Sequence, residues 1–390
     1  MSDLNATLQQ QIEPQRVHQA AFDLVSIPSP TGDSRRAAEW YAERLRALGL
    51  PVTFDEEFPD SPSVIAYIEG GQPGPTLELA GHLDVIPVPQ DPPTIRDGYL
   101  YGRGACDMKG SLAAVLEAAR VLIPARDRLR GKLMICAYGL HEAPVGRGQS
   151  LQRLIERGLV GDAVISVEGP DDEVAIIGKG MSTYEIFIER AGEPVHEVQA
   201  SPDLPHALLV GLDVAQALRA WDAELRQGED LPFVGPESVF IGQFISGDFY
   251  NRVPNRCHIV GTRRYAPHRR FPEVLAEFEA RLDAIRQRTT ATIRLDLVKT
   301  KDGFRVREDE PLVQALQQGY QQVTGKPLPL GGLKAVGDAS NFVNEGGVPA
   351  VYFGCGLERA HATPEFVALD RLERLARVLV ATTVNYLAQP

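Results

Sequence analysis

The sequence has few cysteines, no long apolar run and no excess of basic residues, and each absence excludes a class of protein. Its 390 residues include four cysteines, which lie far apart and never at CxxC spacing. This excludes a disulfide scaffold and indicates a cytosolic protein with reduced thiols. No apolar stretch approaches the roughly 20 residues that span a bilayer. Residues 1–5 lack the basic flank and apolar stretch of a signal peptide, so we expect no membrane association.

Basic residues are also too few for a nucleic-acid partner. Lys+Arg 40 against Asp+Glu 52 gives a formal net charge of -12. A protein that neutralises nucleic-acid phosphates needs a basic patch, and one that binds an anionic membrane surface needs a polybasic segment. We therefore expect neither partner. Arginines nevertheless outnumber lysines, which leaves guanidinium groups available to bind small anions.

Strands and helices alternate over the first 178 residues. Helices are predicted at 15–25, 34–48, 109–121 and 150–157, and strands at 51–54, 64–68, 76–80, 132–138 and 163–167. Strands that alternate with helices of ten to fifteen residues indicate βαβ units around a mostly parallel sheet. The pattern returns later, with a helix from 311, a strand at 350–353 and a helix at 369–386. We therefore predict one α/β domain, made of residues 1–178 and 300–390, in which helices flank a mostly parallel central sheet.

The intervening residues, 179–299, have a different pattern. Residues 182–190 alternate polar and apolar side chains, which is typical of an antiparallel strand with one exposed face. A helix at 205–226, strands at 238–245 and 258–265, a helix at 272–288 and a strand at 292–298 follow. This β-α-β-β-α-β order is that of the ferredoxin-like fold. We therefore predict an inserted α+β domain at 179–299.

A histidine and an aspartate follow the strand at 76–80. Ligands bind beyond the carboxyl ends of parallel strands, which is where His82 would lie. Residues two apart on an extended chain point to the same side, so Asp84 is placed to orient the imidazole of His82. A capped strand end without any function explains these two residues equally well.

Asp107 lies in the glycine-rich segment 102–110, GRGACDMKG. Neither Gly102 nor Gly104 fits the spacing of a Walker loop or a dinucleotide fingerprint, so we exclude phosphate binding. Asp107 directly precedes a predicted helix and can be its N-cap. Its other possible role is that of a metal ligand, which requires partners.

Candidate partners follow other predicted strands. Each alone is more often structural, but histidines and carboxylates that follow several strands of one sheet are together typical of a metal site. Such a nitrogen and oxygen set suits zinc, cobalt or manganese, and five or more ligands can hold two ions. The residues are His141 and Glu142 after the strand at 132–138, Glu168 after 163–167, and His361 and Glu365 after 350–353.

These segments together resemble the M20 metallopeptidases. The resemblance rests on Gly81-His82-Leu83-Asp84, the segment 102–110, Glu168-Gly169-Pro170 and His361, and it covers nearly the whole chain. It implies a catalytic α/β domain with an inserted ferredoxin-like lid that commonly forms the dimer. It also implies a hydrolase of the group that holds acetylornithine deacetylases, succinyl-diaminopimelate desuccinylases, aminoacylases and carboxypeptidase-type enzymes.

The resemblance further implies a role for each candidate ligand. His82 and Glu168 would hold one divalent cation, Glu142 and His361 a second, and Asp107 would bridge the two. Zinc is the expected ion, with cobalt or manganese as alternatives. Two such cations lower the pKa of a water molecule and polarise the substrate carbonyl.

The resemblance also implies roles outside the ligand set. Asp84 would be the partner of His82. His196 in the lid would stabilise the developing oxyanion, with His206 as a weaker candidate. Asn251 would lie near the substrate, and Arg264 would hold a substrate carboxylate through two parallel hydrogen bonds.

One position departs from the family pattern. The family has Glu-Glu after the third strand, the first as general base and the second as metal ligand, whereas this chain has His141-Glu142. We favour Glu142 as the ligand and His141 as the base, because imidazole titrates near neutral pH. In a second interpretation His141 binds metal and Glu142 is the base. In a third, hydrolysis is lost or altered and the chain is a non-hydrolytic relative that binds a ligand or partner.

We therefore predict a cytoplasmic, dinuclear metal-dependent amidohydrolase. It would remove an acyl group or a terminal residue from a small N-acyl amino acid or dipeptide, with acetylornithine-type deacylation as the first expectation. We also predict a homodimer that forms through the lid.

Overall fold

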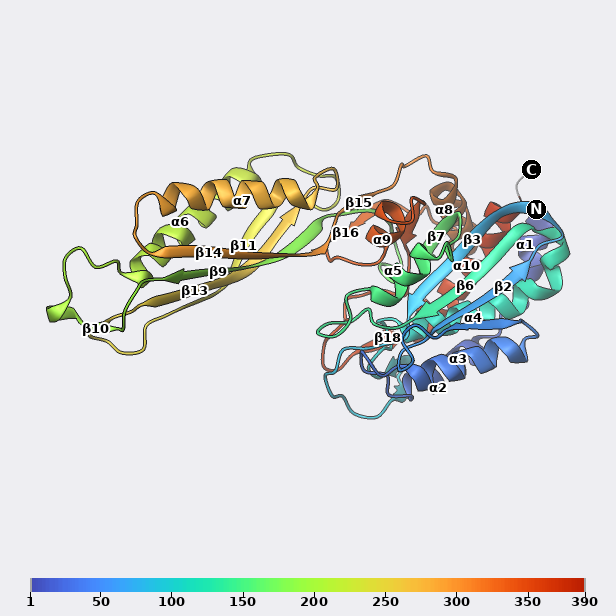
Figure 1. Cartoon of the computed structure of the whole chain (residues 1–390). Coiled ribbons are helices and arrows are strands. Elements are labelled where there is room, and N and C mark those ends of the chain that lie inside the picture. The colour runs from blue at the N-terminus through green and yellow to red at the C-terminus, as the bar shows by residue number, and fades with distance from the viewer. Residues whose placement is uncertain (1, 389–390) are drawn as a thin grey trace. The chain divides into compact units, whose positions relative to one another are not determined.

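The computed structural model describes residues 2–388, which form two compact units (Figure 1). The first unit contains the chain up to Ile176, then Val306–Gly332, then the chain from Asp338. The second unit contains Ile177–Arg305 and Leu333–Gly337. The main segment of the second unit thus begins at Ile177 and ends at Arg305. The short return of 333–337 to the second unit has no counterpart in the sequence prediction.

A mixed sheet forms the centre of the first unit. Its strands run in the order β1-β2-β6-β3-β7-β17-β8, and the pairs β6/β3, β3/β7 and β7/β17 are parallel. The pairs at both edges are antiparallel. The strands are β1 (Val52–Asp55), β2 (Ser63–Glu69), β3 (Gln72–His82), β6 (Arg130–Tyr138), β7 (Ala163–Ser166), β8 (Val174–Gly178), β16 (Leu330–Leu333) and β17 (Ala350–Tyr352).

Helices flank this sheet, as the sequence predicts. The burial of strand ends such as 77–82 of β3 and 133–138 of β6 explains their nearly continuous apolar runs. Helix α4 and helix α10 both pack against β3 and against each other. The helices are α1 (Ser2–Gln9), α2 (Pro14–Val25), α3 (Arg35–Ala47), α4 (Lys109–Leu122), the 3-10 helix η1 (Ile123–Arg128), α5 (Gln149–Glu156), α8 (Pro311–Thr324), α9 (Ala339–Asn344) and α10 (Leu369–Leu387).

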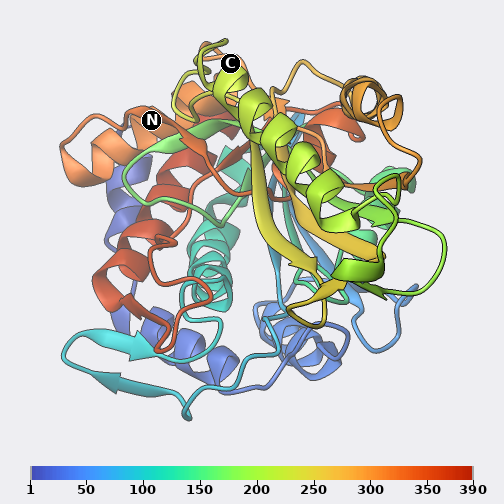
Figure 2. The ribbon, with the colours of Figure 1, turned by 90° about the vertical axis from the view of Figure 1, so that its left-hand side faces the viewer.

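The second unit contains a four-stranded antiparallel sheet in the order β11-β13-β9-β14. With two helices between the strands, this is the predicted β-α-β-β-α-β arrangement. Helix α6 packs against β11 and β13, and Figure 2 shows it along one face of these strands. The elements are β9 (Gly180–Glu189), β10 (Val195–His196), η2 (Glu197–Gln199), α6 (Ala207–Arg226), β11 (Ser238–Ser246), β12 (Arg252–Val253), β13 (Arg256–Tyr265), α7 (Phe271–Arg286), β14 (Thr292–Lys301) and β15 (Phe304–Arg305).

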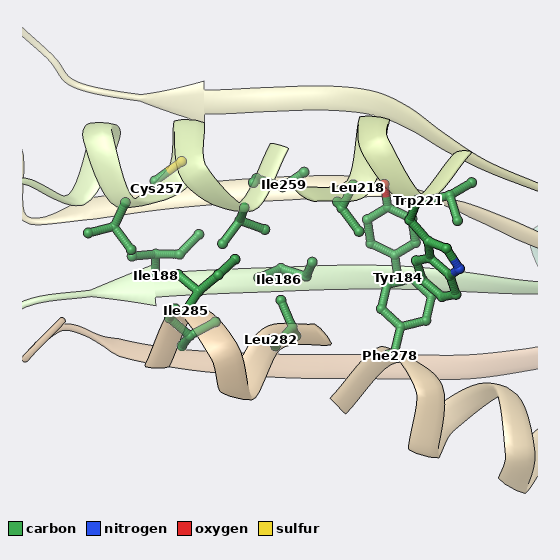
Figure 3. Packing of buried hydrophobic residues seen from close by; sticks show 14 of the residues in the cluster. Tyr184, Ile186, Ile188, Leu218, Trp221, Cys257, Ile259, Phe278, Leu282 and Ile285 are labelled. Atoms are coloured by element: carbon green, nitrogen blue, oxygen red, sulfur yellow. The ribbon is translucent and has the colours of Figure 1, made fainter. Parts of the chain in front are cut away.

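One face of β9 forms the core of the second unit. Tyr184, Ile186 and Ile188 are fully buried beneath α6 and α7, while the residues between them are exposed or half-buried (Figure 3). Trp221 of α6 meets Phe278 of α7 edge to face, with ring centroids 4.8 Å apart. The alternation predicted for residues 182–190 is thus confirmed, and its cause is a sheet with helices on one side only.

A small three-stranded sheet was not predicted. It consists of β4 (Thr94–Arg96), β5 (Tyr99–Tyr101) and β18 (Phe366–Ala368), all antiparallel. Asp97 and Gly98 join β4 to β5 with φ of 52° and 80°, and Asp-Gly is a strong signal for such a hairpin. Among the described residues 2–388, no helix is both long and apolar enough to cross a membrane.

We predict that Gly261→Ala destabilises the second unit. A Cβ at Gly261 would lie 1.9 Å from the carbonyl oxygen of Phe240 and 2.4 Å from Oη of Tyr184, so the strand backbone must shift. Forced overpacking of this kind costs about 1–3 kcal/mol. Gly242→Ala is the matched control, because its nearest neighbour atom would be 3.5 Å away. Urea unfolding should show a loss of stability for the first variant alone, and equal midpoints would contradict this packing.

Candidate metal centre

The carboxyl ends of neighbouring strands bring the predicted ligands together. His82 ends β3, Glu142 follows β6 and Glu168 follows β7, and these strands are adjacent in the order β6-β3-β7. Asp107 lies just before α4, and His361 lies between β17 and β18. Four of the five are buried, and His361 is the exposed member. The sequence predicted this convergence because parallel strands end at one edge of a sheet.

Asp107 lies between two histidines. Its Oδ1 is 3.2 Å from Nε2 of His82, and its Oδ2 is 3.3 Å from Nε2 of His361. The same Nε2 of His361 is 3.0 Å from Oε1 of Glu142. Ligand atoms of His82, Asp107 and Glu142 all lie within 4.8 Å of one another. Nitrogen and oxygen atoms at this spacing are able to hold a divalent cation.

A second group of possible ligands shares His82. Ligand atoms of His82, His141 and Glu168 also lie within 4.8 Å of one another. The rings of His82 and His141 are stacked, with centroids 4.1 Å apart and an angle of 2° between their planes. The two groups share His82, which places Glu168 in the same pocket as Asp107 and Glu142.

Burial and close contact shift the pKa values of these residues strongly. Hydrogen bonds with Asp107 and Glu142 raise the pKa of His361 to about 10. Burial raises the pKa of Asp107, but hydrogen bonds with His361 and His82 outweigh it and hold that pKa below its usual range. Burial, followed by the charge of Asp107, raises the pKa of Glu168 to about 7. Without a metal, the protonated ring of His361 thus contacts both Asp107 and Glu142.

Glu168 provides a test of whether these residues fit a cation. Its Oε2 is buried and has no hydrogen-bond partner among the described residues 2–388. Such an oxygen is costly unless a donor or a cation meets it. When ionised, Glu168, Asp107 and Glu142 each carry a negative charge, and unprotonated histidines have no positive charge to neutralise them. The donor set and the unmet oxygen therefore fit bound divalent cations.

Asp84 has a different partner from the one predicted. Its backbone oxygen lies 2.9 Å from Nδ1 of His82, whereas its Oδ1 lies 3.8 Å away, beyond hydrogen-bond distance. Its Oδ2 accepts hydrogen bonds from the backbone N–H groups of His141 at 3.0 Å and of Glu142 at 2.9 Å. We predicted that the Asp84 carboxylate orients the imidazole of His82, but it is not the group that lies within hydrogen-bond distance of that ring. The carbonyl does so, and the carboxylate fixes the turn that carries His141 and Glu142.

Glu365 holds the loop that carries Asp107. Its Oε1 accepts hydrogen bonds from the backbone N–H groups of Gly104 at 2.9 Å, Cys106 at 3.1 Å and Asp107 at 3.2 Å. Its Oε2 pairs with Nη1 of Arg103 at 2.7 Å. Glu365 was grouped in sequence with the carboxylates that follow strands, and here it supports the loop rather than the cation pocket.

His141 has a carboxylate partner that the sequence did not reveal. Its Nδ1 lies 2.8 Å from Oδ2 of Asp338, and Oη of Tyr138 donates to the same oxygen at 2.8 Å. Burial lowers the pKa of His141, but the charge of Asp338, its hydrogen bond with the ring and the charge of Glu168 together raise that pKa above its usual value. Asp338 directly precedes α9, but its side chain forms no capping hydrogen bond with that helix.

Two backbone positions next to the pocket are unusual. Leu140 has φ of 59° and His361 has φ of 61°, in the left-handed region that side chains other than glycine rarely adopt. Such positions persist where the surrounding structure fixes them, and they often occur at functional sites. The carbonyl of Leu140 accepts a hydrogen bond from Gly148 at 2.9 Å, which closes the turn that presents His141.

The remaining predicted site residues belong to the second unit. His196 in β10 lies beside β12, and its Nε2 is 3.0 Å from the side-chain amide of Asn251. These two predicted residues are therefore neighbours. Arg264 in β13 donates from Nη1 to the carbonyl of Lys334 at 3.1 Å, and burial lowers its pKa. His206, the weaker candidate, directly precedes α6.

The sequence matches the family model of peptidase family M20/M25/M40 over residues 79–385, most of the chain. The chain belongs to this family. It is accordingly a metal-dependent amide hydrolase, and the predicted resemblance is confirmed. The match covers both units and all ten predicted site residues.

Curated relatives and solved structures extend the comparison. The chain is 28% identical over 392 residues to a succinyl-diaminopimelate desuccinylase of Marinobacter nauticus, covering 94% of this chain and 98% of the relative. It is 29% identical over 377 residues to the enzyme of that name from Alkalilimnicola ehrlichii, covering 92% and 96%. Its fold is similar to aminopeptidase PepT from Bacillus cereus, with a TM-score of 0.81, 19% identity and coverage of 96% and 99%. It is also similar to YxeP from Bacillus subtilis, with a TM-score of 0.71, 16% identity and coverage of 96% and 98%.

We predict that Glu168→Gln stabilises the metal-free protein at alkaline pH. Because folding raises the pKa of Glu168 from 4.5 to about 7, the parent is favoured below pH 4.5 and loses stability as the pH rises through 7. A shift of this size corresponds to about 3 kcal/mol. A neutral glutamine avoids this cost but is a poor metal ligand.

Thermal unfolding with a chelator should therefore give a higher midpoint for the Glu168→Gln variant than for the parent at pH 8, and equal midpoints at pH 4. Added zinc should raise the midpoint of the parent more than that of the variant. Glu43→Gln, at an exposed position of α3, should behave as the parent throughout. A Glu168→Gln variant no more stable than the parent at pH 8 would show that Glu168 is not an unmet buried charge.

Proposed function

We propose that this protein hydrolyses the amide bond of a small N-acyl amino acid through a site for two divalent cations. The observation that carries the proposal is the position of Asp107, whose two carboxylate oxygens face His82 and His361 separately. A carboxylate with one oxygen toward each histidine is suited to bridge two ions. YxeP, a similar fold, is described as a dinuclear metal binding peptidase.

The ligands divide into two sets around Asp107. We assign His82 and Glu168 to one ion, and Glu142 and His361 to the other. Zinc is the ion we expect, and cobalt or manganese would suit the same donors. When bound, the cations would acidify a water molecule and polarise the substrate carbonyl.

The other residues would act on protons and on the substrate. His141 would take a proton from the attacking water and return it to the leaving amine. His196, beside Asn251, would donate a hydrogen bond to the developing oxyanion. Arg264 would bind the free carboxylate of the substrate, for which its planar guanidinium group is suited.

The substrate class we propose is an N-acylated diamino acid. Acetylornithine-type deacylation is the expectation from sequence, and the relatives that match over nearly the whole chain are named for desuccinylation. Both names describe removal of an acyl group from an amino group of an amino acid with a free carboxylate. Dipeptides form a second substrate class, because a dipeptidase, Dug1p from Saccharomyces cerevisiae, shares the fold with a TM-score of 0.75.

A substrate screen with defined metal content tests this proposal. The purified protein would be loaded with zinc, cobalt or manganese and given N-acetylornithine, N-succinyl-diaminopimelate and a dipeptide. We expect hydrolysis of at least one acylated diamino acid, its loss with a chelator, and a fall of at least about 100-fold in His82→Ala. Protein that takes up no metal, or whose activity is unchanged in that variant, would refute the proposal.

The replacement of glutamate by His141 favours one other function, that of a non-hydrolytic relative. His141→Glu separates the two. If the parent is inactive and this variant gains hydrolysis, the parent site binds without cleaving. If the variant loses the activity of the parent, His141 is the working residue.

We also propose that the protein is a cytoplasmic homodimer that pairs through the second unit. Its four cysteines are all free and buried, which suits a reducing compartment. β11 lies at one edge of the four-stranded sheet and exposes apolar side chains, which favours pairing with another strand. Phe240 of β11 is 63% exposed and Leu209 of α6 is 54% exposed.

Phe240→Asp should therefore shift the protein from dimer to monomer in light scattering coupled to size-exclusion chromatography. A buried charge at an apolar interface is costly, whereas one at a free surface is not. Val298→Asp is the matched control, because Val298 is 55% exposed on β14, the opposite edge of the same sheet. A dimer that survives Phe240→Asp and dissociates with Val298→Asp would place the interface at the β14 edge and contradict the proposal.

A further inference from the structure

The ring of His141 cannot share an ion with His82 as it lies. The lone pair of an imidazole nitrogen points outward in the plane of the ring, and zinc binds it at about 2.0–2.1 Å. Two rings stacked with centroids 4.1 Å apart and 2° between their planes occupy separate parallel planes. No single ion can lie in both planes. The closeness of His82, His141 and Glu168 therefore does not make His141 a ligand beside His82.

The contacts of His141 instead fix its protons. An ionised carboxylate only accepts hydrogen bonds, so Oδ2 of Asp338 takes one from Oη of Tyr138 and one from Nδ1 of His141. Nδ1 must then carry the proton of the neutral imidazole. Nε2 is left as the free acceptor, which is the state that a general base requires.

The surroundings of this pair are suited to hold one geometry. Tyr138 ends β6 and is fully buried, and Asp338 is 1% exposed. Two donors on one oxygen fix the carboxylate, the carboxylate fixes one edge of the His141 ring, and the His82 ring covers one face of it. His141 is also anchored by its backbone N–H, which donates to Asp84.

We propose that Asp338, supported by Tyr138, is the positioning residue for His141, and that it holds the imidazole as the Nδ1–H form with Nε2 free to accept a proton. This rests on the proposed function. As the water oxygen bonds to the carbonyl carbon, Nε2 takes one water proton, and the same proton passes to the amine nitrogen as the C–N bond breaks. Family members carry a negative charge on their glutamate base. In this chain that charge lies on Asp338, which contacts the His141 ring on the side away from Nε2.

Asp338→Asn tests the proposal by removing the reason for a single tautomer. An amide can accept from Nδ1–H through its oxygen or donate to a bare Nδ1 through its nitrogen, so both tautomers become accessible. We expect kcat to fall by about 100-fold or more, with KM changed less than about threefold and metal content unchanged. Asp127→Asn, at an exposed position of η1, should match the parent. Tyr138→Phe keeps the Asp338–His141 contact and should lower kcat by only about fivefold.

A readout independent of activity is the tautomer itself. Long-range ¹⁵N–¹H spectra of the metal-free protein with labelled histidine, taken at alkaline pH where the imidazole is neutral, would identify His141 among the eight histidines by comparison with His141→Gln. The parent and Tyr138→Phe should show protonated Nδ1 and bare Nε2, and Asp338→Asn should show a mixture.

The outcomes separate this proposal from the proposed function. Hydrolysis by the parent, together with an Asp338→Asn variant of unchanged kcat and tautomer, overturns the positioning role and leaves the function standing. A parent that cleaves no substrate but shows the Asp338-dependent tautomer overturns the function and leaves the positioning role standing. If Asp338→Asn does not fold, a Tyr138→Phe variant whose His141 ring has lost the Nδ1 proton counts against the proposal, and one that retains it with lowered kcat supports it.

Discussion

Three carboxylates, those of Asp107, Glu142 and Glu168, are buried in one pocket, and their mutual repulsion is the constraint on which the rest of the site depends. Without a cation, hydrogen bonds with Asp107 and Glu142 raise the pKa of His361 to about 10, and burial, followed by the charge of Asp107, raises the pKa of Glu168 to about 7. Divalent cations would replace the protons that these two residues hold and meet the free oxygen of Glu168. The same arrangement that makes the metal-free pocket unfavourable therefore favours bound cations.

Other acidic residues near the pocket hold its geometry through backbone hydrogen bonds. Asp84 binds the backbone N–H groups of His141 and Glu142, and Glu365 binds three N–H groups of the loop before Asp107. Backbone donors offset part of the cost of burying a carboxylate, although burial still raises the pKa of Glu365. Part of the net charge of -12 thus fixes loops, and part lies on the carboxylates that we propose as metal ligands.

Much of this could be predicted from sequence, because it follows from local pattern. Apolar runs located the central strands, and their ends located His82, Glu142 and Glu168. The partners could not be predicted where they come from distant segments. His141 and Glu142, whose backbone N–H groups Asp84 binds, lie 57 and 58 positions after Asp84. Asp338 lies 197 positions after His141. The hairpin at Asp97-Gly98 was missed although its turn signal was present. The sheet that contains it is completed by β18, which comes from a distant part of the chain.

The central claim is that Asp107 lies between two divalent cations. Crystals grown with zinc and measured at the zinc absorption edge test it most directly, because anomalous scattering locates the ions without reference to activity. The account predicts two peaks, one near His82 and Glu168 and one near Glu142 and His361, each within coordination distance of one Asp107 oxygen. One peak alone, or peaks that are not in contact with Asp107, would contradict it.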